Sequence, residues 1–182
     1  MIDYMDGGHT MKMTSAYANK LLKKLSEDKL YWIGKESDGC TYVAATDEEP
    51  IIPDYDYSEV AAKIRDIDEK VVIIKHAVNI TNATNKVLVD AREMTIDEVL
   101  VRMAQLNSRK STLGYMRKQE PMKRINSGVY GRRKTAPEYR YINYSLDIIK
   151  EEYEAIDSEI AKMQMALDKY NQTVEFEVNI EL

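Results

Sequence analysis

Two runs of apolar residues at heptad spacing constrain the fold of this chain more than any other feature. In each run the side chains recur at alternating intervals of three and four residues, which places them on one helix face and favours packing against another helix. The spacing predicts helices over about 57–82 and 145–170, each roughly 39 Å long at 1.5 Å per residue. The first run is Val60, Ile64, Ile67, Val71, Ile74 and Val78, and the second is Leu146, Ile149, Tyr153, Ile156, Ile160, Met163, Leu167 and Tyr170.

Capping residues and shorter apolar patterns predict two further helices. Thr14 or Ser15 is a suitable N-cap for a helix over about 15–36. Thr95, which is followed by acidic residues, is a suitable N-cap for a helix that continues to about residue 118. Lys110 falls on the apolar seam of the latter helix, where it either extends its amine to solvent or marks a point at which the pairing loosens.

The predicted helix over 57–82 also carries apolar residues away from its seam. A strict two-stranded coiled coil would leave these side chains in water, so we expect this helix to touch more than one neighbour. The residues concerned are Val72, Ile73, Ala77 and Ile80.

Short strands are predicted at 41–45, 139–143 and 174–180, and a small hairpin is predicted within 86–94. The tail over 174–181 alternates apolar and mostly acidic residues, so it is expected to be a C-terminal strand with one buried face. We expect it to lie beside the strand that contains Arg140, because opposite charges on neighbouring strands attract.

Together these elements predict a mainly α fold. The expected architecture is an antiparallel helical bundle or coiled coil of long heptad helices, with a small β-sheet at one end. We expect a single helical domain over 1–182, with a mobile leader over 1–13 and a basic loop over 119–137.

Composition narrows the class of protein. The chain has one cysteine, Cys40, and two histidines, which rules out an intramolecular disulfide and a multi-cysteine zinc site. We expect Cys40 to be a small buried residue, and we expect no metal and no cofactor. The sequence contains no apolar run of ~18 residues and no signal peptide, so we predict a cytoplasmic protein that does not enter a membrane.

Charge is distributed unevenly along the chain. Residues 101–144 hold eleven lysines and arginines against two acids, whereas the segments on either side are acidic. One interpretation is complementarity inside the fold or across a dimer, in which the basic segment lies against acidic helices. The other is a site for phosphate, nucleic acid or an acidic partner. We favour the first, because the acidic flanks would repel a polyanion.

The strongest functional candidate is the basic segment over 119–140 and the tyrosines beside it. Basic side chains can neutralise phosphates while tyrosines stack on bases. The sequence shows no nucleophile–base pair, phosphate loop or metal cluster, so we expect a non-catalytic structural or protein-interaction protein, a homodimer through its helical faces. The alternative is a nucleic-acid-binding accessory protein. In either case the candidate partner-binding or nucleic-acid-binding residues are Lys123, Arg124, Tyr130, Arg132, Arg133, Lys134, Arg140 and Tyr141.

Several short segments resemble those of a known family. These are Glu48-Glu49-Pro50, Asn79-x-Thr81-Asn82-x-Thr84, Met94 to Glu98, Ile156-Asp157-x-x-Ile160 and Asn171-Gln172-Thr173. In these segments, spread over about residues 48–175, the chain resembles the uncharacterised bacterial septicolysin-like helical proteins, small proteins without an established activity. The resemblance implies a helical fold and assigns no activity and no site residue.

Overall fold

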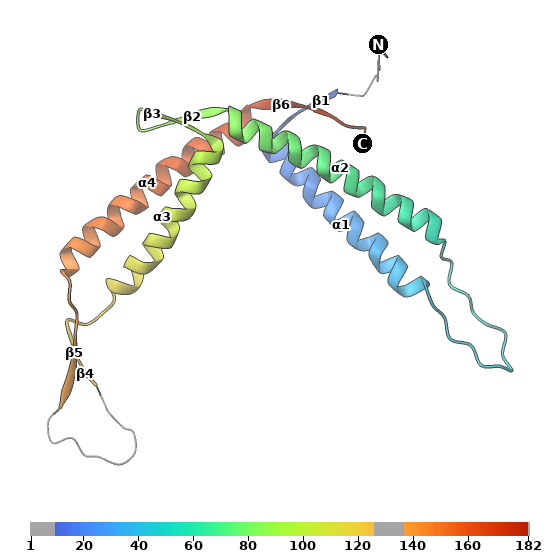
Figure 1. The fold of residues 1–182 in the computed structure, drawn as a ribbon, viewed down its shortest axis with the longest axis horizontal. Helices are drawn as coiled ribbons and strands as arrows, with labels where there is room; N and C mark the ends of the chain where they lie inside the picture. The colour runs from blue at the N-terminus through green and yellow to red at the C-terminus, as the bar shows by residue number, and fades with distance from the viewer. Residues whose placement is uncertain (1–9, 126–136, 182) are drawn as a thin grey trace, which may run out of the picture. The chain divides into compact units, whose positions relative to one another are not determined.

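The computed structural model describes residues 10–125 and 137–181 of the 182-residue chain. The prediction of a mainly helical chain is confirmed: in these residues four α-helices are accompanied by six short strands, which form small two-stranded sheets (Figure 1). In chain order the elements are β1 (Thr10–Thr14), α1 (Ser15–Gly39), α2 (Tyr57–Thr84), β2 (Lys86–Val89), β3 (Arg92–Thr95), α3 (Ile96–Met116), β4 (Met122–Ile125), β5 (Glu138–Tyr141), α4 (Leu146–Thr173) and β6 (Glu175–Asn179).

The described chain divides into two compact units, residues 10–87 with 167–181 and residues 88–166. Compactness does not measure independent folding, so the expectation of a single domain stays a prediction. None of the described helices is both long enough and apolar enough to span a membrane.

The first unit is built on the helix pair α1 and α2. Thr14 caps α1 by accepting a hydrogen bond from the Tyr17 backbone N–H at 3.2 Å, and Asp56 caps α2 through the N–H groups of Ser58 and Glu59. Figure 1 shows the two helices side by side. Apolar side chains of both helices and of the two-stranded sheet form one core: Met13, Ala18, Leu25, Ile67, Ile74, Val178 and Ile180.

The sheet of the first unit corrects one prediction and confirms another. Residues 10–13 were expected in a mobile leader, but they belong to β1, which pairs antiparallel with β6. Met11 and Met13 share a sheet face with Phe176 and Val178 and pack on the core. On the other face Lys12 lies opposite Glu177, with 3.7 Å between Nζ and Oε1. The C-terminal strand with one buried face is therefore confirmed, and it pairs with residues 10–14.

The second unit begins with the predicted small hairpin, β2 and β3. Asp90 and Ala91 form its two-residue turn with φ of 47° and 65°, as a tight hairpin with the right-handed strand twist requires. Thr95 and Glu98 then form a capping box at the start of α3: the Thr95 hydroxyl accepts from the Glu98 N–H, and the Glu98 carboxylate accepts from the Thr95 N–H.

Helices α3 and α4 run antiparallel in the second unit. Arg102 is bound to Glu159 and Arg109 to Glu152, so the partner number falls as the residue number rises. Apart from Ile96 at the start of α3, the buried residues that α3 and α4 contribute to this unit recur at intervals of seven: Val99, Leu106 and Leu113 on α3, and Ile149, Ile156 and Met163 on α4.

Four predictions about the short strands and loops are wrong, and one about Cys40 is wrong as well. Residues 41–45 form no strand. Part of the segment expected as a basic loop, 119–137, forms β4, which pairs with β5. Arg140 on β5 therefore lies opposite Lys123 rather than beside the acidic tail, because the tail pairs with β1. Instead of one sheet, the described strands form three separate pairs. Cys40, expected buried, is exposed.

Candidate interaction surfaces

The β4–β5 ribbon gathers four of the predicted binding residues. These are Lys123, Arg124, Arg140 and Tyr141, and all four side chains are exposed. The register places Lys123 opposite Arg140 and Arg124 opposite Tyr139. Like charges directly opposite each other on neighbouring strands destabilise the pairing. The Lys123 amine lies 3.4 Å from the Glu120 carboxylate, which offsets part of this repulsion. An anion bound to this face would offset more of it.

The opposite face of the same ribbon is aromatic. Successive residues of a strand alternate between faces, so Arg124 and Met122 share a face with Tyr139 and Tyr141. The two tyrosine rings are tilted against each other, with 6.4 Å between their centroids. Flat aromatic surface beside a guanidinium can stack on a nucleic-acid base.

Contacts at the base of the ribbon join it to the end of α3. The Ile142 N–H donates to the Pro121 carbonyl at 3.2 Å, and the Tyr144 hydroxyl donates to the Met116 carbonyl at 2.8 Å. Lys123, Arg124, Arg140 and Tyr141 are thus brought together on the ribbon. The other four predicted residues, Tyr130, Arg132, Arg133 and Lys134, lie outside the described residues.

Three basic residues of the central segment are bound to α4. Arg102 donates two hydrogen bonds to Glu159, of 3.0 and 3.4 Å. Arg109 donates two to Glu152, of 2.8 and 3.1 Å. The hydrogen bond from Arg109 lowers the pKa of Glu152 and raises the pKa of Arg109. Complementarity inside the fold is therefore the correct interpretation for these side chains.

Lys110 sits on the seam of α3 and is the third such residue. Its amine is hydrogen-bonded to Asp157, which raises its pKa, and it lies 5.5 Å from the centre of the Tyr153 ring. The Arg117 guanidinium lies 4.1 Å from the same ring centre. Of the two alternatives for Lys110, loosened pairing does not occur: Leu113 beyond it is buried, and the Lys110 amine extends to a carboxylate beside the seam instead of to solvent.

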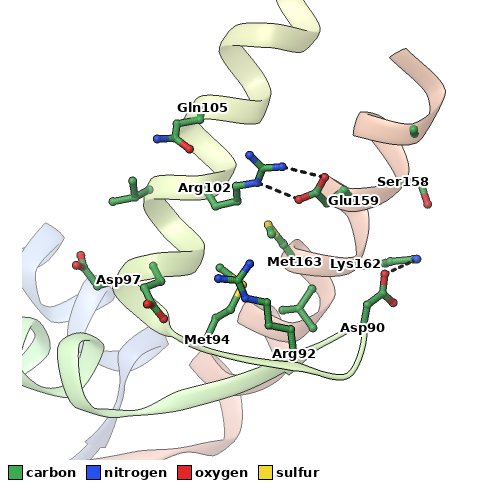
Figure 2. A pocket seen from close by; sticks show the side chains of 14 residues that line it. Asp90, Arg92, Met94, Asp97, Arg102, Gln105, Ser158, Glu159, Lys162 and Met163 are labelled. Atoms are coloured by element: carbon green, nitrogen blue, oxygen red, sulfur yellow. Dashed lines mark hydrogen bonds and ion pairs between the residues drawn. The ribbon is translucent and has the colours of Figure 1, made fainter. Parts of the chain in front are cut away.

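A pocket of about 1020 Å³ lies among the β2–β3 hairpin, α3 and α4. Met94 and Met163 line it together with two ion pairs, Arg102 with Glu159 and Lys162 with Asp90 (Figure 2). In the second pair 2.6 Å separates Nζ from Oδ2. Arg92 lines the pocket and makes no hydrogen bond or ion pair with any other described residue. Cations and carboxylates are mixed along the lining, so the pocket favours neither sign of charge in a ligand.

A smaller groove of about 440 Å³ runs between α1 and α2. No charge pattern in the sequence indicated this groove, because its basic residues are dispersed through an acidic part of the chain. A usable signal was present: Lys20 and Lys24 are one helical turn apart and directly precede the seam residues Leu21 and Leu25. Lysines in that position line the edge of a groove rather than an open surface.

Comparisons with known proteins identify a similar fold and no function. No family model matches the chain, and no curated protein matches it. A crystal structure of a functionally unknown conserved protein from Corynebacterium diphtheriae is similar, with a TM-score of 0.64 and 12% sequence identity over 91% of this chain and 99% of that one. At this identity the similarity shows a shared fold, and the chain is similar to a bacterial protein of unknown function.

Proposed function

We propose that this chain is a structural protein-interaction protein without a catalytic step, a cytoplasmic helical bundle whose helix pairs pack as coiled coils. We also propose that it forms a homodimer through its helical faces and that its likeness to the septicolysin-like proteins reflects a common fold. The exposed apolar and charged side chains on its long helices support the proposed protein-interaction function.

The seven-residue spacing on α3 and α4 supports the coiled-coil part of the proposal. Val99, Leu106 and Leu113 are buried at this spacing, and the arginines beside them, Arg102 and Arg109, repeat at the same interval. Their partners on α4, Glu159 and Glu152, are also seven residues apart. Buried apolar positions flanked by charge pairs between the helices are typical of coiled coils.

One observation carries the proposed homodimer: α2 has a second apolar stripe. Val72, Ile73 and Ile80 are 66%, 39% and 52% exposed. At 100° per residue this stripe lies on the side of α2 away from the buried Ile67 and Ile74. The sequence predicted that the apolar residues away from the seam of this helix contact a further neighbour. Val72, Ile73 and Ile80 instead remain exposed within the described chain. We propose that a second copy of the chain covers them.

Sedimentation velocity tests this proposal. We expect the wild-type chain to sediment as a dimer at micromolar concentration, and the variant Val72→Ser/Ile73→Ser/Ile80→Ser to sediment as a monomer with unchanged helical circular dichroism. The matched control replaces three leucines on other exposed surfaces, Leu30, Leu88 and Leu100, by serine and should remain dimeric.

A wild-type chain that stays monomeric at about 100 μM would contradict the homodimer, since interfaces of standard size hold at such concentrations. A triple variant that remains dimeric would show that the α2 stripe is not the interface.

The β4–β5 ribbon supports a second candidate function, nucleic-acid binding through the segment 119–140. The observation that favours it is the register: Lys123 and Arg140 face each other on one side, and Tyr139 and Tyr141 form an aromatic surface on the other. Cations bind phosphates in a salt-dependent manner, and tyrosine rings stack on bases of any sequence.

Fluorescence anisotropy with labelled single- and double-stranded DNA and RNA tests this candidate. The variant Lys123→Ala/Arg124→Ala/Arg140→Ala should bind less tightly, and its salt slope should be smaller by about one for each phosphate that is no longer neutralised. The control Arg65→Ala/Lys75→Ala/Lys169→Ala removes the same charge outside the basic segment and should behave as wild type. Absence of binding at low salt, where the attraction is strongest, would remove this candidate.

A further inference from the structure

The groove between α1 and α2 has an apolar floor and a basic rim. Leu25 and Ile67 are buried beneath it, and Leu21 and Trp32 are half-buried. Lysines from both helices and the Tyr17 ring stand along its edges. The ionisable side chains of the lining, other than Tyr17, are Lys20, Lys24, Lys63, Lys70, Asp28 and Asp66.

The cations of this groove are in excess over its carboxylates. Lys70 is bound to Asp66, with 2.9 Å between Nζ and Oδ2. Lys20, Lys24 and Lys63 form no ion pair with any other described residue. Asp28 lines the groove without an ion pair in the same part of the chain. Three uncompensated lysines against one carboxylate leave the groove positively charged.

In the other helix pair, α3 and α4, the basic side chains beside the buried residues form ion pairs with the facing helix. Between α3 and α4, Arg102 and Arg109 each meet a glutamate from the facing helix. Along the α1–α2 groove, the lysines of one helix meet no carboxylate of the other. The ion pair between α1 and α2 that joins Lys29 to Asp68 involves residues outside the groove lining. The groove thus lacks the acidic partner that α4 supplies to α3.

We propose that this groove docks an acidic amphipathic α-helix of a partner protein. The inference rests on the proposed interaction function and names the kind of partner that the α1–α2 pair recognises. Leucine-like side chains of the partner would enter between Leu21, Trp32 and Ile67, and its carboxylates would pair with the lysines on both rims. Trp32 supplies the large aromatic contact surface on which such docking energy concentrates.

The spacing of the lysines favours a helix over other ligands. Lys20 and Lys24 are separated by roughly 6 Å along their helix. Carboxylates four residues apart on a third helix repeat at this interval. A groove between two packed helices also has the shape into which the side-chain ridge of a third helix fits. A small anion would meet only one or two of the lysines.

Trp32 gives the docking test a direct readout, because it is the only tryptophan in the chain. The probe is a synthetic peptide of about 18 residues without tryptophan, in which leucines at heptad spacing are flanked by glutamates. We expect it to shift the Trp32 emission with a dissociation constant in the micromolar range at low salt. The same peptide with lysine in place of glutamate should leave the emission unchanged.

Charge reversal locates the binding surface. The variant Lys20→Glu/Lys24→Glu/Lys63→Glu should bind the acidic peptide at least about tenfold less tightly, because three attractions become repulsions. The control Lys75→Glu/Lys118→Glu/Lys169→Glu changes the net charge equally outside the groove and should bind as wild type. Equal weakening in both variants, or an acidic peptide that leaves Trp32 emission unchanged, would overturn the inference.

Sedimentation of the same variants separates this inference from the proposed homodimer. The groove variant should keep the wild-type sedimentation coefficient. If it became monomeric instead, a second copy of the chain would be the occupant of the groove, and the acidic partner helix would be refuted. If the wild-type chain were itself monomeric, the homodimer would fail while the peptide titration could still confirm the groove.

Discussion

The variant Leu113→Ala is expected to lose about 2–5 kcal/mol of unfolding free energy. Leu113 is 0% exposed, on the buried side of α3. Alanine removes the apolar packing of three carbon atoms and leaves a cavity that packed helices refill only in part. Urea denaturation followed by circular dichroism at the helical band measures the change.

Leu100 on the same helix is the matched control. It is 46% exposed, so Leu100→Ala removes the same atoms from a position that is largely in water already. We expect its unfolding free energy to lie within about 0.5 kcal/mol of the wild-type value. Equal losses in the two variants would mean that the burial of Leu113 does not stabilise the fold.

Deleting residues 175–182 is expected to destabilise the first unit by about 3–6 kcal/mol, from the burial of Val178 and Ile180 alone. Both side chains lie in the same core as Met13 and Ile74, and Phe176 packs against it. The deletion also removes the hydrogen-bonding partner of β1, so residues 10–14 would lose their strand conformation. Thermal unfolding measures the first effect, and amide hydrogen exchange of residues 10–14 measures the second.

The acidic face of the tail provides the control for this deletion. Glu175→Gln/Glu177→Gln/Glu181→Gln removes its charges and keeps its apolar face, so stability should change little, because the Lys12–Glu177 pair is exposed to solvent. If this variant unfolded like the deletion, charge rather than apolar burial would hold the strand in place.

Helix positions could be predicted from the sequence because their signals are local. The two heptad runs lie within α2 and α4, and Thr95 is the N-cap of α3, as predicted. Each of these signals concerns residues within a few positions of one another, so neither the capping nor the periodicity depends on a distant partner.

Strand pairing could not be predicted in the same way. The alternation of residues 174–180 correctly indicated a strand with one buried face, but no local pattern states which strand lies beside it. The partner is β1, more than 160 residues away in the sequence. The strand β4 was missed because Met122–Ile125 does not alternate, and its pairing with β5 makes it a strand.

The candidate surfaces could likewise be predicted only in part from the sequence. Composition alone identified the basic central segment, yet only the tertiary structure showed that Arg102, Arg109 and Lys110 are bound to carboxylates of α4, whereas Lys123, Arg124 and Arg140 stand exposed on a ribbon. Charge is a property of the chain, but the availability of a charge depends on which carboxylates the fold brings within reach.

The sequence by itself determined where this protein is helical, which face of each helix is apolar and where the strand at its end lies, because period and capping are encoded over one or two helical turns. The tertiary structure alone decided that β6 pairs with β1 and that three lysines of α1 and α2 line a groove without an ion pair to another described residue. Both depend on contacts between residues far apart in the chain, whose partners are chosen by the free energy of the whole fold rather than by any local pattern.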